Sequence, residues 1–233
     1  MDLSHIDIPG AIFQLIAFLF AISVHESAHA WMANRCGDPT ARMLGRITLN
    51  PIKHIDPIGT IVMPLIALIT GIPVIGWAKP TPVDPRNFKN PVKDDILTAV
   101  VGPLSNFVVA MGTVVLMFFI AKTSMQGSVL VKSIAAYGPG YAQVAGPSFL
   151  VPVTLFFYEL MVINVVLGVF NLIPVPPLDG SHVLRHFLSD SVRRVYDAVG
   201  MFGLLALVYL GGNLLSRLIT PFLVFFRRLL FKF

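Results

Sequence analysis

Long apolar stretches alternate along this chain with short segments that are rich in charge, proline and glycine. Three of the stretches, 8–33, 96–120 and 149–173, contain about 25 residues each, and about 20 apolar residues in a helix cross the hydrocarbon core of a bilayer. A fourth stretch, 195–213, is predicted to cross as well. The pattern therefore predicts an all-α, polytopic membrane protein with about four transmembrane helices.

The stretch 57–78 differs from these four, because prolines and glycines interrupt it and basic residues flank it on both sides. Basic residues are typical of cytoplasmic loops, and a segment whose two flanks lie on the same side of a membrane cannot cross it. We expect a re-entrant hairpin or a short extended segment at membrane depth, where irregular backbone must be protected or line a cavity.

The remaining segments connect or follow the spans. The third span is broken by prolines and continues as a short segment, 178–188. The end of the chain, 214–233, mixes apolar residues with four basic ones and is predicted to form an amphipathic tail at the interface. The stretch 121–148 contains only two charged residues and is expected to be a loop on the outer side.

Composition agrees with a membrane protein. Hydrophobic residues make up 55% of the chain, charged residues make up 12%, and the mean hydropathy is +0.79, which excludes an ordinary soluble domain. No polar stretch is long enough for a separate module, so 1–233 is predicted to be a single membrane-embedded domain. The single cysteine, Cys36, excludes an internal disulfide.

A net charge of +5 can indicate a protein that binds nucleic acid. Here, however, the basic residues gather in loops between spans, as on the cytoplasmic side of a multi-pass membrane protein. We expect no nucleic-acid partner and a location in the cell membrane. The first span has neither a basic leader nor a small-residue cleavage site, so it is predicted to be retained.

The first span carries the polar motif His25-Glu26-Ser27-Ala28-His29. Because four residues make slightly more than one helical turn, His25 and His29 lie on nearly the same face and can each give one nitrogen to a tetrahedral zinc. Glu26 can then take a proton from metal-bound water, as in the HExxH pattern of zinc proteases. Chance placement would produce this pattern in about one of a thousand chains of this composition.

A catalytic zinc needs a third protein ligand and an open position for water. Asp179 is the best candidate, because it follows the proline break in the third span and is expected at the same, cytoplasmic, depth as the two histidines. The alternative is that Asp179 only caps the short segment that follows it. A rival site would combine Asp179 with His182 and His186, but no acid or base accompanies it.

The chain resembles the site-2 protease family of intramembrane zinc metalloproteases. The resemblance depends on the motif at 25–29, on Asn171-Leu172-Ile173-Pro174-Val175-Pro176-Pro177-Leu178-Asp179-Gly180, and on Gly102-Pro103-Leu104-Ser105-Asn106 between them. It implies one zinc per chain, bound by His25, His29 and Asp179, with Glu26 activating water. It also implies a membrane peptidase domain of the compact subgroup, without a PDZ-like or cystathionine-synthase-like domain.

Three further polar residues are candidates for substrate contact or transition-state support. The Asn171 amide is placed by the resemblance near the reacting peptide, and helix packing is the alternative. Asn106 and Asn164 are predicted to make polar contacts between spans, with proximity to the active site left open for Asn106. His54 is a candidate for orienting substrate, although a bond to Asp56 or to lipid headgroups is the stronger expectation.

The predicted substrates are single-span membrane proteins, and a homo-oligomer or a regulatory membrane partner is left open. The alternative function is a metal-binding membrane protein or an ion transporter, in which His25, His29, Asp179 and Glu159 line an ion route. Glu26 distinguishes the two, because a transport site needs ligands but does not need a base beside them. Glu159 itself is expected to be a neutral, hydrogen-bonded carboxyl group.

Overall fold

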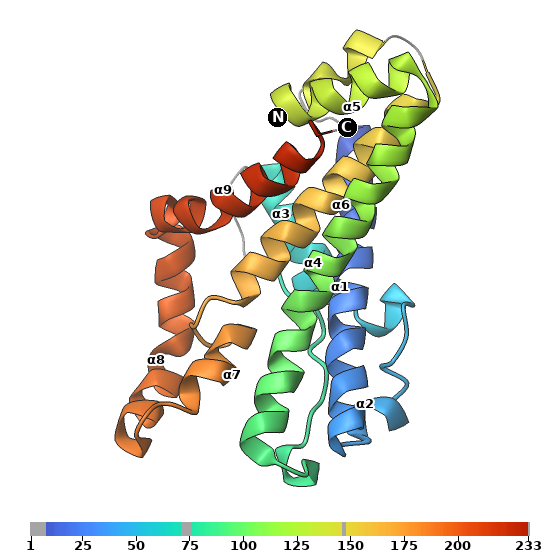
Figure 1. The fold of residues 1–233 in the computed structure, drawn as a ribbon. Coiled ribbons are helices and arrows are strands. Elements are labelled where there is room, and N and C mark those ends of the chain that lie inside the picture. Colours follow the sequence, from blue (N-terminus) through green and yellow to red (C-terminus); the bar gives the residue numbers. More distant parts are fainter. Residues whose placement is uncertain (1–7, 71–75, 146–147, 233) are drawn as a thin grey trace. The chain divides into compact units, whose positions relative to one another are not determined.

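The computed structural model describes residues 8–70, 76–145 and 148–232. All of the described elements are helices, which confirms the prediction of an all-α fold (Figure 1). Three helices are long and apolar enough to cross a membrane: α1 (Ile8–Cys36), α4 (Pro91–Thr123) and α6 (Leu150–Asn171).

A further candidate span consists of two helices. α8 (Asp190–Tyr209) and α9 (Gly212–Leu229) are together long and apolar enough for a span, but they are bent by 77° at the break between them. α9 covers most of the segment predicted to be an interfacial tail and includes three of its four basic residues. The described residues thus contain three helices that could span a membrane, or four spans if the bent pair is counted as one, as expected of a polytopic membrane protein.

The bounds of α1 follow from its sequence. Residues 11–36 contain neither glycine nor proline, so nothing interrupts the helical hydrogen bonds. The next residue, Gly37, has a φ of +112°, a conformation that residues with a Cβ rarely adopt. A Cβ at this position would also approach the carbonyl oxygen of Asn87 to 2.9 Å. Gly37 therefore ends the helix and allows the chain to turn closely past residue 87.

The segment 57–78 is helical over much of its length. A π-helical turn, η3 (Pro57–Val62), leads into α3 (Met63–Thr70); residues 71–75 lie outside the described part, and residues 76–84 have no regular secondary structure. The two ends of the segment lie side by side, because the Trp77 N–H donates to the Gly59 carbonyl at 3.2 Å. The remaining short elements before α4 are α2 (Thr40–Met43), η2 (Pro51–Lys53) and η4 (Pro85–Asn87).

The stretch 121–148, expected to be a loop, contains a helix of 13 residues, α5 (Met125–Tyr137), and a short 3₁₀ helix, η5 (Pro139–Ala145). The Ser124 side chain caps α5 by accepting the Gly127 N–H at 3.0 Å. The expectation of a loop was wrong because it was based only on the small number of charged residues. The apolar residues of this stretch have helical spacing and form a buried face: Leu130, Val131, Ile134 and Ala135.

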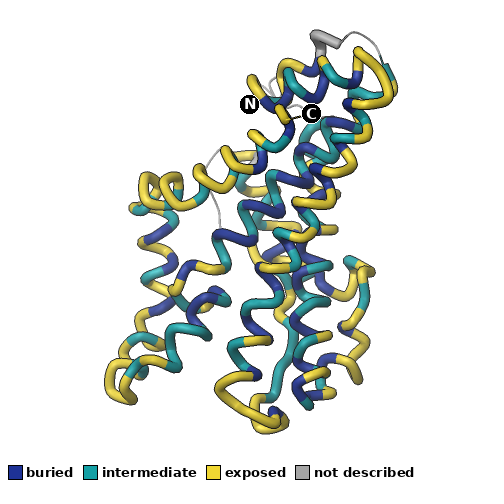
Figure 2. The backbone as a smooth tube through the Cα atoms, viewed as in Figure 1, coloured by how far each residue is buried: buried dark blue, intermediate teal, exposed yellow. Residues whose placement is uncertain are grey.

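The chain divides into two compact units. The first contains the described residues up to Ala21, Asn106–Val169 and the residues from Arg217 onward; the second contains Ile22–Ser105 and Phe170–Ser216. Buried residues occur along the elements of both (Figure 2). The first unit has a core built from α4, α5, α6 and α9, with Tyr158, Met161 and Leu130 among its fully buried side chains.

The second unit contains smaller apolar clusters. In one, residues from the end of α6 and the following turn pack with α8, including Ile173, Leu178 and Leu204. A short helix after that turn, α7 (Asp179–Arg185), belongs to the same unit. The second unit thus contains the HExxH motif and all of α7.

Candidate metal centre

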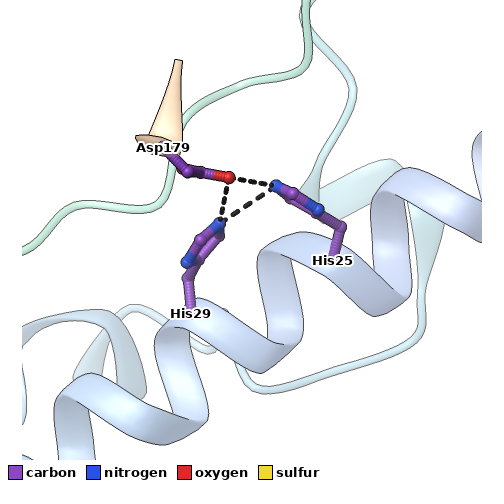
Figure 3. Close-up of side chains that lie close together, drawn as sticks. All are labelled: His25, His29 and Asp179. Carbon is purple, nitrogen blue, oxygen red and sulfur yellow. Dashed lines mark hydrogen bonds and ion pairs between the residues drawn. The ribbon is translucent and has the colours of Figure 1, made fainter. Parts of the chain in front are cut away.

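Two imidazoles of α1 face each other on successive turns of the helix (Figure 3). The Nε2 atoms of His25 and His29 lie 3.0 Å apart, and both residues are only 7% exposed. Two ring nitrogens at this distance repel unless a proton or a metal ion lies between them. The pair is therefore arranged to share a cation.

The third group comes from α7, at least 150 residues later. Pro174, Pro176 and Pro177 end α6 and direct the chain into a turn, and α7 begins at Asp179. Gly180 permits this turn, because a Cβ there would collide with the backbone of Leu172, the residue after α6. The absence of a side chain at 180 allows the first turn of α7 to lie directly against that backbone.

The Asp179 carboxylate faces both imidazoles (Figure 3). Its Oδ2 atom lies 3.1 Å from Nε2 of His25 and 3.4 Å from Nε2 of His29. The N-cap residue of α7 is Leu178, and it makes no side-chain capping bond. The carboxylate thus faces the imidazoles at the start of α7.

The geometry of these three atoms fits zinc. In a tetrahedral site with ligands about 2.0 Å from the ion, two ligand atoms lie about 3.3 Å apart, and the three separations here are 3.0, 3.1 and 3.4 Å. Among the described residues, the buried Oδ2 atom of Asp179 meets no hydrogen-bond donor besides the two rings. The same residues are the one group of three metal-ligating side chains that converges in the described part of the chain.

Two residues of α4 lie against the imidazoles of His29 and His25. The Thr98 carbonyl lies 2.6 Å from Nδ1 of His29 and accepts its N–H in the neutral ring, which leaves the Nε2 lone pair directed at Asp179 and His25. One turn further along, a Cβ at Gly102 would overlap the His29 ring and lie 2.9 Å from Cε1 of His25. The backbone of α4 is therefore in direct contact with both imidazoles.

Glu26 is held by a residue that the sequence analysis did not select. Its Oε2 atom accepts the backbone N–H of Thr81 at 2.8 Å and the Thr81 hydroxyl at 2.7 Å. Glu26 also lies within electrostatic range of His29. The carboxylate is thus fixed beside the two imidazoles by two hydrogen bonds from a single residue.

The segment that carries Thr81 is itself fixed by backbone contacts. The Lys79 N–H donates to the His54 carbonyl at 2.9 Å. The buried guanidinium of Arg46 donates to the carbonyls of Lys53 and Lys79. No motif marks these contacts in the sequence, because they use backbone groups that every residue has.

The three candidates for substrate contact lie in different surroundings. The His54 ring is buried, with Nε2 2.8 Å from the Thr48 carbonyl, and Asp56 instead caps η3. Burial lowers the pKa of His54, so the ring stays neutral near pH 7. Asn171 ends α6 and is half-buried. His54 therefore has a supporting role, because its carbonyl accepts the Lys79 N–H in the segment that leads to Thr81.

Asn106 belongs to the other compact unit. Its amide is fully buried and donates to Asn164 Oδ1 at 2.9 Å and to the Ala21 carbonyl at 3.3 Å. These are the contacts between helices that were expected for the two asparagines. In the same unit, the Gln14 amide donates to the Glu159 carboxyl at 3.5 Å. Asn106 thus makes contacts between helices, and Glu159 is hydrogen-bonded to a residue of α1.

The rival site is not assembled. His182 and His186 face Asp95 on α4, with separations of 3.3 Å from Nδ1 to Oδ1 and 2.7 Å from Nε2 to Oδ2, respectively. Asp179 instead faces the α1 histidines, because it lies at the opposite end of α7 from His186. Nothing in the sequence pattern selects Asp95 as the partner.

The chain is similar to a family of peptidases and to proteins named as zinc metalloproteases. The model of a family described as Peptidase family M50 matches residues 13–210. The chain is 34% identical over 196 residues to "Putative zinc metalloprotease YwhC" of Bacillus subtilis, covering 84% of this chain and 78% of that protein. It is 28% identical over 209 residues to "Putative zinc metalloprotease Rip2" of Mycolicibacterium smegmatis, covering 89% of this chain and 66% of that protein. No solved structure matches the chain.

Proposed function

The chain belongs to peptidase family M50, which makes it a metalloendopeptidase, and from this premise we propose that it cleaves peptide bonds within or near the transmembrane segments of other membrane proteins. The observation that carries the proposal is the approach of His25 Nε2, His29 Nε2 and Asp179 Oδ2 to within 3.0–3.4 Å of one another beside Glu26. These groups lie in or next to helices of membrane-spanning length, so the reaction takes place at membrane depth.

His25, His29 and Asp179 would hold one zinc ion per chain. Zinc held by these three side chains would supply a Lewis acid that lowers the pKa of water and polarises the scissile carbonyl group. The neutral His29 tautomer set by Thr98 keeps Nε2 available as a ligand.

Glu26 would act as the general base. Its carboxylate takes a proton from the attacking water and passes it to the leaving amine. Thr81 holds one carboxylate oxygen through two donors, so the other oxygen is left for this proton transfer. At the end of α6, the Asn171 amide would hold the substrate backbone or stabilise the developing oxyanion.

We propose that single-span membrane proteins, including remnants of signal peptides, are the substrates. A substrate helix must unwind to expose a carbonyl group, because its backbone groups are hydrogen-bonded within the helix. The site would lie toward the cytoplasmic side of the cell membrane, because the basic residues gather in the loops on that side. A homo-oligomer and a regulatory membrane partner are both compatible with this function.

Removal of the metal tests the proposal. We expect a zinc chelator to abolish cleavage of single-span proteins reconstituted with the enzyme in vesicles, and one equivalent of zinc to restore it. Elemental analysis should find about one zinc atom per chain, and mass spectrometry should place the cut within or beside the transmembrane segment. Cleavage that persists in the metal-free protein, or cuts confined to extramembrane loops, would contradict the proposal.

Replacement of Thr81 tests how Glu26 is held. In Thr81→Val the backbone N–H remains, but the hydroxyl that donates to Glu26 at 2.7 Å is lost. A hydrogen bond to a charged group contributes about 1.5 kcal/mol or more, so we expect kcat to fall about tenfold. Zinc content and KM should stay unchanged, because neither the ligands nor a substrate contact is altered.

The matched control is Thr123→Val. The Thr123 hydroxyl is exposed and donates to a carbonyl within α4, in the other compact unit. This variant should keep the kcat of the unmodified protein. Equal kcat values for the two valine variants would mean that the Thr81 hydroxyl does not position the base.

A further inference from the structure

Two histidines of α7 that the proposed reaction does not use lie against one carboxylate. Asp95, near the start of α4, is 2.7 Å from His186 and 3.3 Å from His182. The side chain of Asp95 is 14% exposed, and those of His186 and His182 are 19% and 41% exposed. We call these three residues the Asp95 cluster. Because its aspartate is largely buried, its hydrogen bonds are made in a poorly solvated setting and are stronger than those of an exposed pair.

The cluster joins α7 to α4. α7 has only seven residues, which is too short for a helix to be stable without tertiary contacts. His182 lies one turn after Asp179, and His186 is the C-cap residue of the helix. The cluster therefore attaches the helix to α4 at two points that follow Asp179 along its length.

The same part of α4 also supports the other two candidate ligands. Thr98 lies three residues after Asp95 and accepts the His29 ring N–H, and Gly102 lies four residues further on, against both imidazoles. Spacings of three and four residues place Asp95, Thr98 and Gly102 on one face of the helix. A single face of α4 thus contacts the histidines of α1 and the helix that carries Asp179.

We propose that Asp95 is a positioning residue: by binding His182 and His186 it fixes α7 on α4 so that the Asp179 carboxylate reaches the His25 and His29 rings. The inference extends the proposed zinc protease and depends on its metal site. Asp95 does not touch the three ligand atoms, so its effect is transmitted through α7. Residues that orient metal ligands in this way typically change metal affinity by about 10- to 100-fold when they are replaced.

α7 also has a contact that provides a matched control. Arg185 donates to Asp197 on α8 at 3.1 Å, and both side chains are more than a third exposed. Exposed ion pairs of this kind contribute little to stability. Replacing Asp197 therefore removes a carboxylate partner of α7 without changing its attachment to α4.

The test measures zinc affinity by competition with a chromophoric chelator, using the full-length protein in detergent. We expect Asp95→Ala to weaken zinc binding at least about tenfold, and Asp95→Asn to weaken it less because the amide can still hydrogen-bond to the histidines. Asp197→Asn should bind zinc within about twofold of the unmodified protein. Circular dichroism and the melting temperature of the zinc-free proteins separate a change at the site from a loss of fold.

Unchanged zinc affinity in Asp95→Ala would overturn the proposed role of Asp95 while leaving the zinc site itself established. Equal weakening in Asp197→Asn would also overturn it, because any loosening of α7 would then have the same effect. If Asp95→Ala does not fold, His186→Ala decides the question, since it removes the shorter contact of the cluster. An unmodified protein that binds no zinc would instead refute the proposed function.

Discussion

Glu26→Gln should bind zinc normally and cleave no detectable substrate. The amide has the size of the carboxylate and can still accept the Thr81 hydrogen bonds, but it cannot take a proton from water. General-base catalysis typically contributes about 10²- to 10⁴-fold to a rate, so we expect kcat to fall by about 10³-fold or more. The measurement pairs elemental analysis of the purified variant with cleavage of single-span proteins in vesicles.

The second glutamate of the chain provides the control. Glu159 lies on α6, is held by Gln14 and is absent from the proposed mechanism. Glu159→Gln should therefore retain cleavage. Full activity in Glu26→Gln would refute the role of Glu26 as base. Loss of ion flux in Glu159→Gln, together with flux that persists in Glu26→Gln, would instead support the transporter alternative.

Asp179→Ala should lose the metal as well as the activity. Without the carboxylate, only two imidazoles remain, and a catalytic zinc site needs three protein ligands to retain the ion. We expect the zinc content of the purified variant to fall from about one atom per chain to about a tenth of that after dialysis. Cleavage should fall to background in parallel.

An exposed aspartate elsewhere supplies the comparison. Asp190 begins α8, and its side chain is 78% exposed and paired with Arg193. Asp190→Asn should keep both zinc and activity, because an exposed pair of this kind contributes little. If Asp179→Ala retained a full complement of zinc, the third ligand would have to come from another residue, and the proposed site would be wrong.

The long helices could be predicted from the sequence, whereas one shorter helix could not. The ranges 96–120 and 149–173 overlap α4 and α6 closely, because an apolar run of spanning length is a local property of the chain. The helix at 125–137 was missed because low charge was interpreted as a loop on the outer side. The Ser124 cap and the spacing of Leu130, Val131 and Ile134 were available as signals.

The supporting residues of the site could not be found in the same way. Thr81 acts through its backbone N–H as well as its hydroxyl, and Thr98 acts through its carbonyl. Backbone groups are common to all residues, so no pattern identifies the ones that meet a functional side chain. Asp95 resembles its neighbour Asp94 in sequence, and only the position of α7 distinguishes them.

The sequence by itself determined that His25, Glu26 and His29 lie together on one apolar helix, because the turn of an α-helix sets the relation between residues four apart. It left two interpretations of Asp179, as a metal ligand and as a helix cap. Only the tertiary structure decided that this carboxylate faces the two imidazoles, since the contact joins residues at least 150 positions apart. Such a contact depends on how α7 packs on α4, and packing is a property of the whole fold.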